Sequence, residues 1–408
     1  MSQTIVIFGA TGDLSREKLF PALFNLFKEG SLEDTNIVAF GRREWVDKDF
    51  HEYVYPYIEK RGNKKEINSF LKFVSYEKGT FDDLSGYQEL SKKISDIALF
   101  YLAVSPEHYE TIISKIKESN LKKVFKNQKS KILIEKPFGL DLEKAKILEK
   151  KLRDMCDEDQ IYRIDHYLAK SQVLNMLELK LNNSDFVEFF NNKNIKEISI
   201  RLFEKKDIGT RGISYDNVGA LVDVGQNHLL QVLATTLMVP DVFEPDTVRS
   251  SRMKVLFNLQ VVDIIKGQYQ GYLAHTGVKK NSKTETYFKI KLKSKDEDLK
   301  GIDINIESGK AMEKDLVEIE CLDHENKSFK IEIQPEHSVV GFDKEITKAL
   351  SKKRKEAYEQ LFFDALRTNN ELFPSFEEIV QAWEIVRKAE EKFKGELMIY
   401  KKNKYFIP

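Results

Sequence analysis

The chain has 408 residues, enough for two or three domains and a sizeable hydrophobic core. Its composition is 41% hydrophobic, 32% charged and 11% aromatic, which is normal for a globular protein and too apolar for a disordered one. Lysine plus arginine and aspartate plus glutamate number 66 each, so the zero net charge gives no electrostatic argument for a nucleic-acid or membrane partner.

Cysteine content and the N-terminus indicate the compartment. Cys156 and Cys321 are the two cysteines, and their spacing is unlike that of a metal site. Two thiols in a chain of this length suit a reducing environment. The N-terminus enters a strand pattern without a basic leader, and no window approaches 18 apolar residues. We expect a cytoplasmic protein that has no membrane-spanning helix and binds no metal.

The first part of the chain alternates short apolar runs with helical periodicity. Several of the runs are apolar nearly throughout, as parallel strands buried on both faces should be. Strands are predicted at Thr4–Phe8, Asn36–Phe40, Phe70–Tyr76, Ile97–Ala103 and Lys131–Ile134. Helices are predicted at Leu14–Lys28, Asp47–Lys60, Asp82–Ile94 and Glu107–Glu118. This alternation predicts a Rossmann-type, doubly wound parallel sheet in a domain of residues 1–165.

The pattern changes in residues 166–408, where runs of strands and long helices separate. Strands are predicted at Ile195–Phe203, Tyr287–Leu292, Leu316–Cys321 and Phe329–Gln334. Helices are predicted at Tyr167–Leu181, Gly225–Leu237, Thr247–Leu256, Glu356–Thr368 and Phe376–Phe393. The polar segment Lys279–Lys283 is expected to be a solvated loop. These elements predict a larger α+β domain with a mainly antiparallel sheet.

A glycine-bearing turn follows the first predicted strand and precedes the first helix. Gly9 can make the tight turn, and Gly12 lets backbone N–H groups approach a pyrophosphate at the helix N-terminus. The usual third glycine is missing, because Leu14 or Ser15 stands in its place. A purely structural turn is the alternative, but the strand–turn–helix context favours dinucleotide binding.

The end of the second predicted strand indicates which dinucleotide. A site for NAD would prefer Asp or Glu there, to hold the ribose 2′-hydroxyl. This strand instead ends in Gly41, Arg42 and Arg43. Guanidinium groups at this position can hold a 2′-phosphate through charge-assisted hydrogen bonds. Two ordinary surface arginines are the alternative, and the position favours NADP.

Two further groups of residues are less decisive when taken alone. Asp165, His166, Tyr167 and Lys170 offer donors suited to a phosphate, although a helix cap followed by surface polar residues is the simpler interpretation of their spacing. His228 lies in a segment of helical character, where a lone histidine is more often structural than catalytic.

Several segments resemble the glucose-6-phosphate dehydrogenases, and they follow one another in the family's order over nearly the whole chain. The most specific is Arg163-Ile164-Asp165-His166-Tyr167-Leu168-Ala169-Lys170, which occurs together with Glu135-Lys136-Pro137-Phe138-Gly139. Other matching blocks are Gly9–Leu14, Lys18–Leu23, Tyr101–Pro106 and Asp223–Gln231. The resemblance implies hydride transfer from C1 of glucose 6-phosphate to NADP, a homodimer formed through the sheet of the second domain, and a place at the start of the oxidative pentose phosphate pathway.

The resemblance also implies roles for individual residues. His228 would be the general base, and the Asp165 carboxylate would orient it. Residues implied to bind substrate are Lys136, His166, Tyr167, Lys170, Glu204, Asp223 and Lys310. Residues implied or argued to bind the cofactor are Gly9, Ala10, Thr11, Gly12, Asp13, Leu14, Lys18, Arg42, Ala103 and Lys136.

The chain also departs from the family pattern, and it leaves rival functions to test. It is shorter than usual members, Glu307 stands where they usually carry an arginine, and a second family lysine appears only as Lys314. One rival function is a related dehydrogenase for another sugar, which the phosphate cluster at His166–Lys170 disfavours. The other is a non-catalytic paralogue that senses NADP or a sugar phosphate, which retention of both Asp165 and His228 disfavours.

Overall fold

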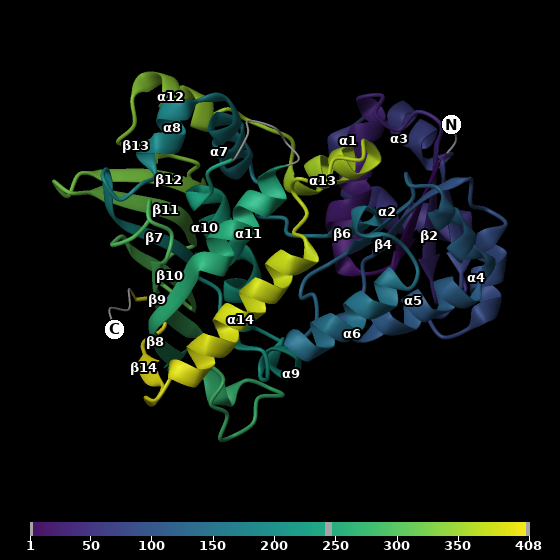
Figure 1. Ribbon diagram of the computed structural model, residues 1–408. Coiled ribbons are helices and arrows are strands. Elements are labelled where there is room, and N and C mark those ends of the chain that lie inside the picture. The colour runs from purple at the N-terminus through teal and green to yellow at the C-terminus, as the bar shows by residue number, and fades with distance from the viewer. Residues whose placement is uncertain (1–2, 241–246, 405–408) are drawn as a thin grey trace. The chain divides into compact units, whose positions relative to one another are not determined.

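The computed structural model describes residues 3–240 and 247–404, which divide into two compact units (Figure 1). The first unit comprises Met1–Ala169 and Lys355–Ser375, and the second comprises Lys170–Arg354 and Phe376–Pro408. The return of the chain to the first unit near its C-terminus has no counterpart in the sequence prediction, which assigns all of residues 166–408 to one domain.

The first unit is built on a parallel sheet with the strand order β3-β2-β1-β4-β5-β6. Every neighbouring pair in this order is parallel, which confirms the doubly wound prediction. Its strands are β1 (Gln3–Phe8), β2 (Thr35–Gly41), β3 (Val74–Lys78), β4 (Ile97–Leu102), β5 (Lys131–Ile134) and β6 (Ile161–Arg163). Ile5 to Phe8 are fully buried, as a strand covered by helices on both faces requires.

The helices of the first unit follow the predicted alternation, with additions. A π-helical turn at Ser15–Leu19 precedes α1, so the predicted helix Leu14–Lys28 has two parts. The α-helices are α1 (Phe20–Lys28), α2 (Asp47–Ile58), α3 (Lys64–Leu71), α4 (Leu84–Ser91), α5 (Tyr109–Glu118), α6 (Leu142–Arg153) and α13 (Ala357–Leu366).

One strand prediction was wrong at its start. Phe70 and Leu71 belong to α3 and not to a strand, and β3 begins only at Val74. The reason is local, because Asn63 and Glu66 form a capping box that nucleates α3.

The second unit contains a mixed sheet with the order β13-β12-β11-β7-β10-β9-β8-β14. The pairs β10–β7 and β14–β8 are parallel and the others are antiparallel, which confirms the predicted mainly antiparallel sheet. Its strands are β7 (Ile195–Glu204), β8 (Leu259–Tyr269), β9 (Tyr287–Ser294), β10 (Asp303–Lys310), β11 (Leu316–Asp323), β12 (Ser328–Gln334), β13 (Val339–Val340) and β14 (Met398–Tyr400).

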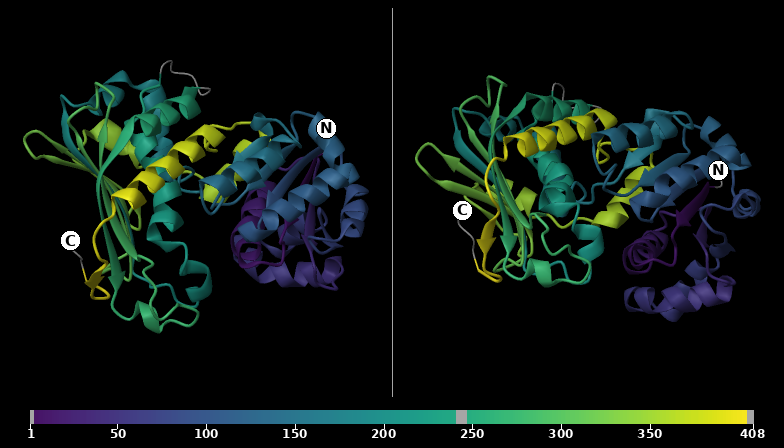
Figure 2. Two further views of the ribbon diagram at one scale, coloured as in Figure 1. Left: turned by 60° about the horizontal axis from the view of Figure 1, so that its bottom comes forward. Right: turned by 90° about the horizontal axis from the view of Figure 1, so that it is seen from below.

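Helices α10, α11 and α14 lie on one face of this sheet (Figures 1 and 2). A buried ion pair of 2.7 Å between Arg252 on α11 and Glu378 on α14 joins two of them. A π-helix at Leu221–Leu229 leads directly into α10. The α-helices are α7 (Ser171–Asn182), α8 (Ser184–Phe189), α9 (Gly212–Tyr215), α10 (Leu230–Leu237), α11 (Val248–Asn258), α12 (Lys344–Leu350) and α14 (Phe376–Lys392).

The opposite face of the mixed sheet carries charged side chains in its middle. Arg201 on β7 contacts the carboxylates of Glu318 and Glu320 on β11, each at 2.7 Å. The alternation of these residues with the buried Ile198, Ile200 and Leu202 follows from the two-residue period of a strand.

Four further features that the sequence analysis addressed can be described in the structure. The loop predicted at Lys279–Lys283 is present, and both cysteines are buried and unbridged. Throughout residues 3–240 and 247–404, no helix combines the length and apolarity needed to cross a membrane. Within the same ranges, no group of three acidic, histidine or cysteine side chains is arranged to hold a metal.

Candidate active site

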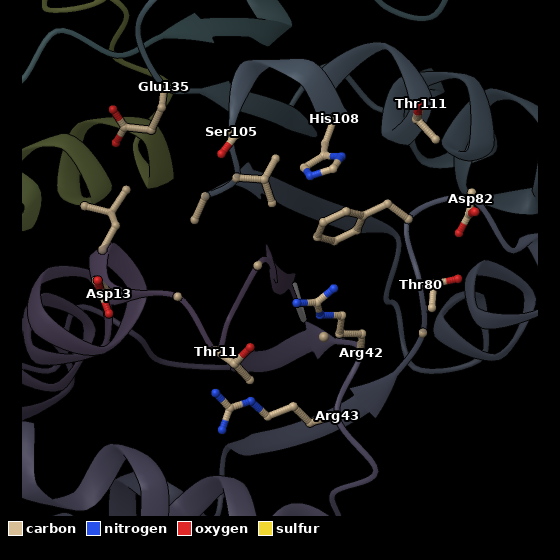
Figure 3. A pocket seen from close by; sticks show the side chains of 18 of the residues that line it. Thr11, Asp13, Arg42, Arg43, Thr80, Asp82, Ser105, His108, Thr111 and Glu135 are labelled. Atoms are coloured by element: carbon tan, nitrogen blue, oxygen red, sulfur yellow. The ribbon is translucent and has the colours of Figure 1, made fainter. Parts of the chain in front are cut away.

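A cavity of about 1000 Å³ opens at the carboxyl ends of β1, β2, β4 and β5 (Figure 3). This is the edge at which doubly wound sheets bind their ligands. Eight of the predicted cofactor residues line it: Gly9, Thr11, Gly12, Asp13, Leu14, Arg42, Ala103 and Lys136. Ala10 lies fully buried in the turn, and Lys18 is exposed on the π-helical turn outside the cavity lining.

The turn after β1 explains the glycine pattern. Gly9 has a φ of +78°, and a Cβ there would come within 2.5 Å of the Ala103 carbonyl oxygen. The Gly12 N–H donates to the Gly9 carbonyl at 2.9 Å, and the Ser15 hydroxyl donates to the same carbonyl at 3.0 Å. Ser15, which replaces the usual third glycine, therefore stabilises the turn.

The two arginines after β2 differ in their surroundings. The Arg43 guanidinium lies over the Trp45 ring at 4.5 Å and over the Tyr53 ring at 5.4 Å. Arg42 is exposed, and within the described ranges it makes no ion pair. Both arginines lie on the same side of the cavity as Thr11 (Figure 3). Arg42 is therefore available to an anionic group of a ligand.

Glu135 lines the same cavity but was not among the predicted site residues, although it stands in a quoted motif. The Tyr101 hydroxyl donates to its carboxylate at 2.6 Å, and Tyr358 on α13 also donates to it. Burial raises the pKa of the Glu135 carboxyl, and the two phenol donors offset part of that effect. Because Tyr358 comes from the returning segment 355–375, sequence proximity could not have indicated this contact.

Asp165, His166 and Tyr167 follow β6 in the first unit. Asp165 is 2% exposed, and its Oδ1 accepts the Tyr167 N–H at 3.0 Å. The His166 ring is stacked on Tyr358 with 5.8 Å between centroids. The predicted helix from Tyr167 was wrong at its start, because α7 begins only at Ser171 and Lys170 is its extended N-cap residue. The motif residues therefore lie in turns ahead of the helix, and Lys170 opens the second unit.

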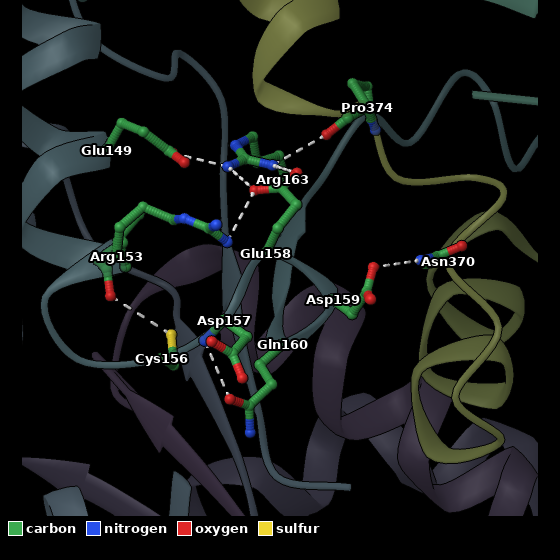
Figure 4. A network of polar contacts seen from close by, with 11 residues as sticks. Glu149, Arg153, Cys156, Asp157, Glu158, Asp159, Gln160, Arg163, Asn370 and Pro374 are labelled. Atoms are coloured by element: carbon green, nitrogen blue, oxygen red, sulfur yellow. Dashed lines mark hydrogen bonds and ion pairs between the residues drawn. The ribbon is translucent and has the colours of Figure 1, made fainter. Parts of the chain in front are cut away.

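A buried arginine anchors the strand that carries this segment (Figure 4). Arg163, 2% exposed, donates to Glu149 at 2.6 Å and to Glu158 at 2.8 and 2.9 Å. It also donates to the Pro374 carbonyl at 3.3 Å. Since these partners come from α6, the turn before β6 and the returning segment, Arg163 joins three parts of the first unit two residues before Asp165.

The second unit brings together three of the predicted substrate residues. Lys310, at the end of β10 and 2% exposed, contacts the Glu204 carboxylate and lies 3.0 Å from Asp223 Oδ2. The parallel register of β10 and β7 pairs Lys310 directly with Glu204. Asp223 comes from the π-helix. One ammonium between two carboxylates leaves the group with a net negative charge, so it suits sugar hydroxyls better than a phosphate.

His228 is also on this π-helix. The sequence pattern predicted an ordinary α-helical segment here and did not predict the π-helical winding. The residue is 2% exposed, and its backbone N–H bonds to Asn227 Oδ1 at 2.7 Å. The Asn227 amide in turn donates to the Val222 and Asp223 carbonyls at 3.1 and 3.2 Å. π-Helical turns occur frequently at functional sites, because they re-aim side chains within a helix.

The two departures from the family pattern lie apart from this group. Glu307 is opposite Arg201 and Lys289 in the sheet. Its carboxylate accepts a hydrogen bond from the Tyr287 hydroxyl and lies 3.6 Å from the Arg201 guanidinium. Burial raises the pKa of the Glu307 carboxyl. Lys314 lines a separate hollow of about 250 Å³ with Lys205, Asp315 and Glu332.

Comparison with known proteins covers the chain in two adjoining parts. The family described as "Glucose-6-phosphate dehydrogenase, NAD binding domain" matches residues 6–175. The family described as "Glucose-6-phosphate dehydrogenase, C-terminal domain" matches residues 177–334 and 321–405.

Individual relatives give the same result. A glucose-6-phosphate 1-dehydrogenase of Cyberlindnera jadinii is 39% identical over 78% of this chain and 68% of its own length. That of Kluyveromyces lactis is 35% identical over 93% of this chain and 87% of its own. A solved structure of a glucose-6-phosphate dehydrogenase in complex with glucose 6-phosphate superposes with a TM-score of 0.89 at 31% identity, covering 100% of this chain and 96% of that one.

Proposed function

The chain belongs to the glucose-6-phosphate dehydrogenase family, and from that premise we propose that it oxidises C1 of glucose 6-phosphate with His228 and Asp165 as its catalytic pair. The hydride acceptor is NADP, and the reaction is the first oxidative step of the pentose phosphate pathway. The observation that most supports the assignment is the family match over both parts of the chain, together with a cavity lined by the predicted cofactor residues.

The first unit suits a dinucleotide that carries an additional phosphate. Glycine at position 9 permits the close approach of the turn to Ala103, and both residues line the cavity proposed for the dinucleotide. Arg42, which has no ion-pair partner in the described part of the chain, supplies a guanidinium for the 2′-phosphate. When bound, NADP supplies the nicotinamide carbon that accepts the hydride.

The sugar phosphate needs two kinds of partner. His166, Tyr167 and Lys170 offer cationic and neutral donors, and we assign them to the 6-phosphate. Glu204, Asp223 and Lys310 form a group of two acceptors and one donor with a net negative charge, and we assign them to the sugar hydroxyls. We assign Lys136, in the cavity lining, to the region shared by sugar and nicotinamide.

The reaction requires that a proton and a hydride leave the sugar together. His228 takes the proton of the C1 hydroxyl, and the C1 hydrogen leaves with its bonding electron pair as a hydride, which the bound NADP would accept. The C1–O1 bond becomes a carbonyl, which gives 6-phosphogluconolactone. The Asp165 carboxylate orients the imidazole and stabilises the imidazolium that forms.

A spectrophotometric assay tests this function. Purified protein is given glucose 6-phosphate or glucose, each with NADP or NAD, and reduced nicotinamide is followed by its absorbance. We expect the highest kcat/KM for glucose 6-phosphate with NADP. Preference for unphosphorylated glucose would indicate a related sugar dehydrogenase, and NADP binding without turnover would indicate a sensing paralogue.

We also propose a cytoplasmic homodimer, formed through the charged face of the mixed sheet around Arg201, Glu318 and Glu320. Support comes from the position of α10, α11 and α14 on the other face (Figure 2). Light scattering coupled to size-exclusion chromatography should give twice the chain mass, and Arg201→Glu should lower it. A wild-type monomer at all concentrations would contradict the proposal.

A further inference from the structure

The turn after β10 adjoins Lys310, the last residue of that strand. Lys310 is followed by Ala311, which has a φ of +55°. A residue other than glycine is disfavoured in this left-handed region, so surrounding contacts must hold the turn. The turn begins directly after Lys310, whose ammonium lies between Glu204 and Asp223.

The C-terminal segment provides part of this support, and the Ala311 and Met312 N–H groups add bonds to the Lys206 and Glu204 carbonyls, each at 3.0 Å. β14 pairs in parallel with β8, which places Tyr400 opposite Tyr269. The Tyr400 hydroxyl lies 2.7 Å from the Lys310 carbonyl oxygen and donates its proton there. Three residues later, the Asn403 N–H donates to the Ala311 carbonyl at 2.7 Å. Two consecutive carbonyls of the strained turn are therefore bonded to the C-terminal segment.

The Tyr400 hydroxyl is built into a larger arrangement. The Thr286 hydroxyl lies 2.9 Å from the Tyr400 oxygen, and the Thr286 carbonyl accepts the Lys310 N–H at 2.9 Å. Burial raises the pKa of the Tyr400 phenol, so it remains a donor at working pH. Gly267 lets β14 approach β8 closely, because a Cβ there would lie 3.1 Å from the Met398 carbonyl oxygen.

We propose that Tyr400 is a positioning residue for sugar binding, which acts by holding the backbone of Lys310 in place. The assignment rests on the proposed function, since it gives Lys310 its role toward the sugar. The C-terminal strand is then part of the substrate site and not only an edge of the sheet. Loss of the Tyr400 hydroxyl should weaken sugar binding, because this hydroxyl bonds to the Lys310 carbonyl at the turn. Cofactor binding should not change, because Tyr400 does not line the cofactor cavity.

The test compares Tyr400→Phe with Tyr272→Phe. Tyr272 is a buried tyrosine of the same cluster, and its hydroxyl bonds to Asp216 at 2.9 Å instead of to the Lys310 turn. We expect Tyr400→Phe to raise KM for glucose 6-phosphate by about three- to tenfold, the effect of one lost hydrogen bond. KM for NADP should stay unchanged, and Tyr272→Phe should leave both constants unchanged.

The outcomes distinguish failure of the Tyr400 role from failure of the proposed function. KM does not depend on the fraction of folded enzyme, so partial misfolding of a variant does not hide the result. The role of Tyr400 alone is overturned if the wild type is active and Tyr400→Phe behaves as Tyr272→Phe does. It is also overturned if Tyr400→Phe raises KM for NADP as much as KM for glucose 6-phosphate. A wild type that does not oxidise glucose 6-phosphate overturns the proposed function and this assignment with it.

Discussion

At the scale of single residues, the candidate site separates charges that are compensated within the protein from those left for ligands. Lys310 is neutralised by Glu204 and Asp223, whereas Arg42 faces the cavity with no ion pair in the described chain. A compensated ammonium can orient hydroxyl groups, and an uncompensated guanidinium can hold a phosphate. This difference assigns the two cations to different parts of the bound molecules.

Replacing His228 with asparagine should remove the general base. We expect kcat to fall by about 10²- to 10⁴-fold with a modest change in KM, because proton removal contributes that much to such reactions. Steady-state assays of His228→Asn measure the effect. His275→Asn is the matched control, since the His275 ring bonds to the Tyr269 hydroxyl and the Gly209 carbonyl and has no assigned role in the reaction. Near-normal turnover in His228→Asn would refute its role.

Replacing Arg42 with alanine should weaken NADP selectively. Loss of a charge-assisted bond to the 2′-phosphate should raise the NADP dissociation constant about tenfold or more and leave that of NAD unchanged. Fluorescence titration of both cofactors measures this. Arg43→Ala should change the preference for NADP over NAD less, because the Arg43 guanidinium packs on the Trp45 ring. Equal losses for NAD and NADP in Arg42→Ala would exclude the assignment.

At the scale of elements, the π-helices are the features that ordinary periodicity does not reveal. The predicted helices at Leu14–Lys28 and Gly225–Leu237 are present, but each is entered through a π-helical segment. Such segments still present an apolar face, so the helix was predictable while its exact winding was not. The winding matters because Asp223 and His228 lie on the same π-helix.

Helix α13 contains a carboxyl whose ionisation opposes folding. Burial raises the pKa of the Asp364 carboxyl, in the last turn of α13, from its ordinary value of 3.8 to about 6. The folded state therefore binds more protons between those values, and the stability present below the lower pKa is lost as pH rises through the higher one. The negative end of the helix dipole acts in the same direction.

Asp364→Asn should therefore stabilise the first unit in a pH-dependent manner. We expect the free energy of unfolding to rise by up to about 3 kcal/mol near pH 7 and to change little near pH 3. Denaturant titrations at both pH values measure the difference. An equal effect at the two pH values would mean that a contact other than the buried charge is responsible.

At the scale of the whole molecule, the cofactor cavity is built from residues of the first unit. Binding of NADP should slow hydrogen exchange in the first unit at residues 9–15, 41–43 and 103–105, because a ligand protects the backbone that it contacts. Mass spectrometry of exchanged peptides gives this readout. Peptides from β11 and β12 serve as the internal control, and protection confined to those strands would contradict the cavity assignment.

The sequence alone determined the class of the first unit, the dinucleotide turn and the arginines after β2. These depend on short-range features: buried apolar runs, a glycine beside a strand end and the residue that follows a strand. It did not reveal the short strand β6, which is only three residues long, nor the capping box that displaced the start of β3.

Only the tertiary structure decided which distant residues meet. Lys310 lies beside Glu204 because β10 and β7 pair in parallel, and beside Tyr400 because β14 adds to β8. Tyr358 reaches Glu135 because residues 355–375 return to the first unit. Strand register and chain return are set by packing over a whole sheet, where a one-residue shift would expose every buried side chain, and local sequence does not contain that information.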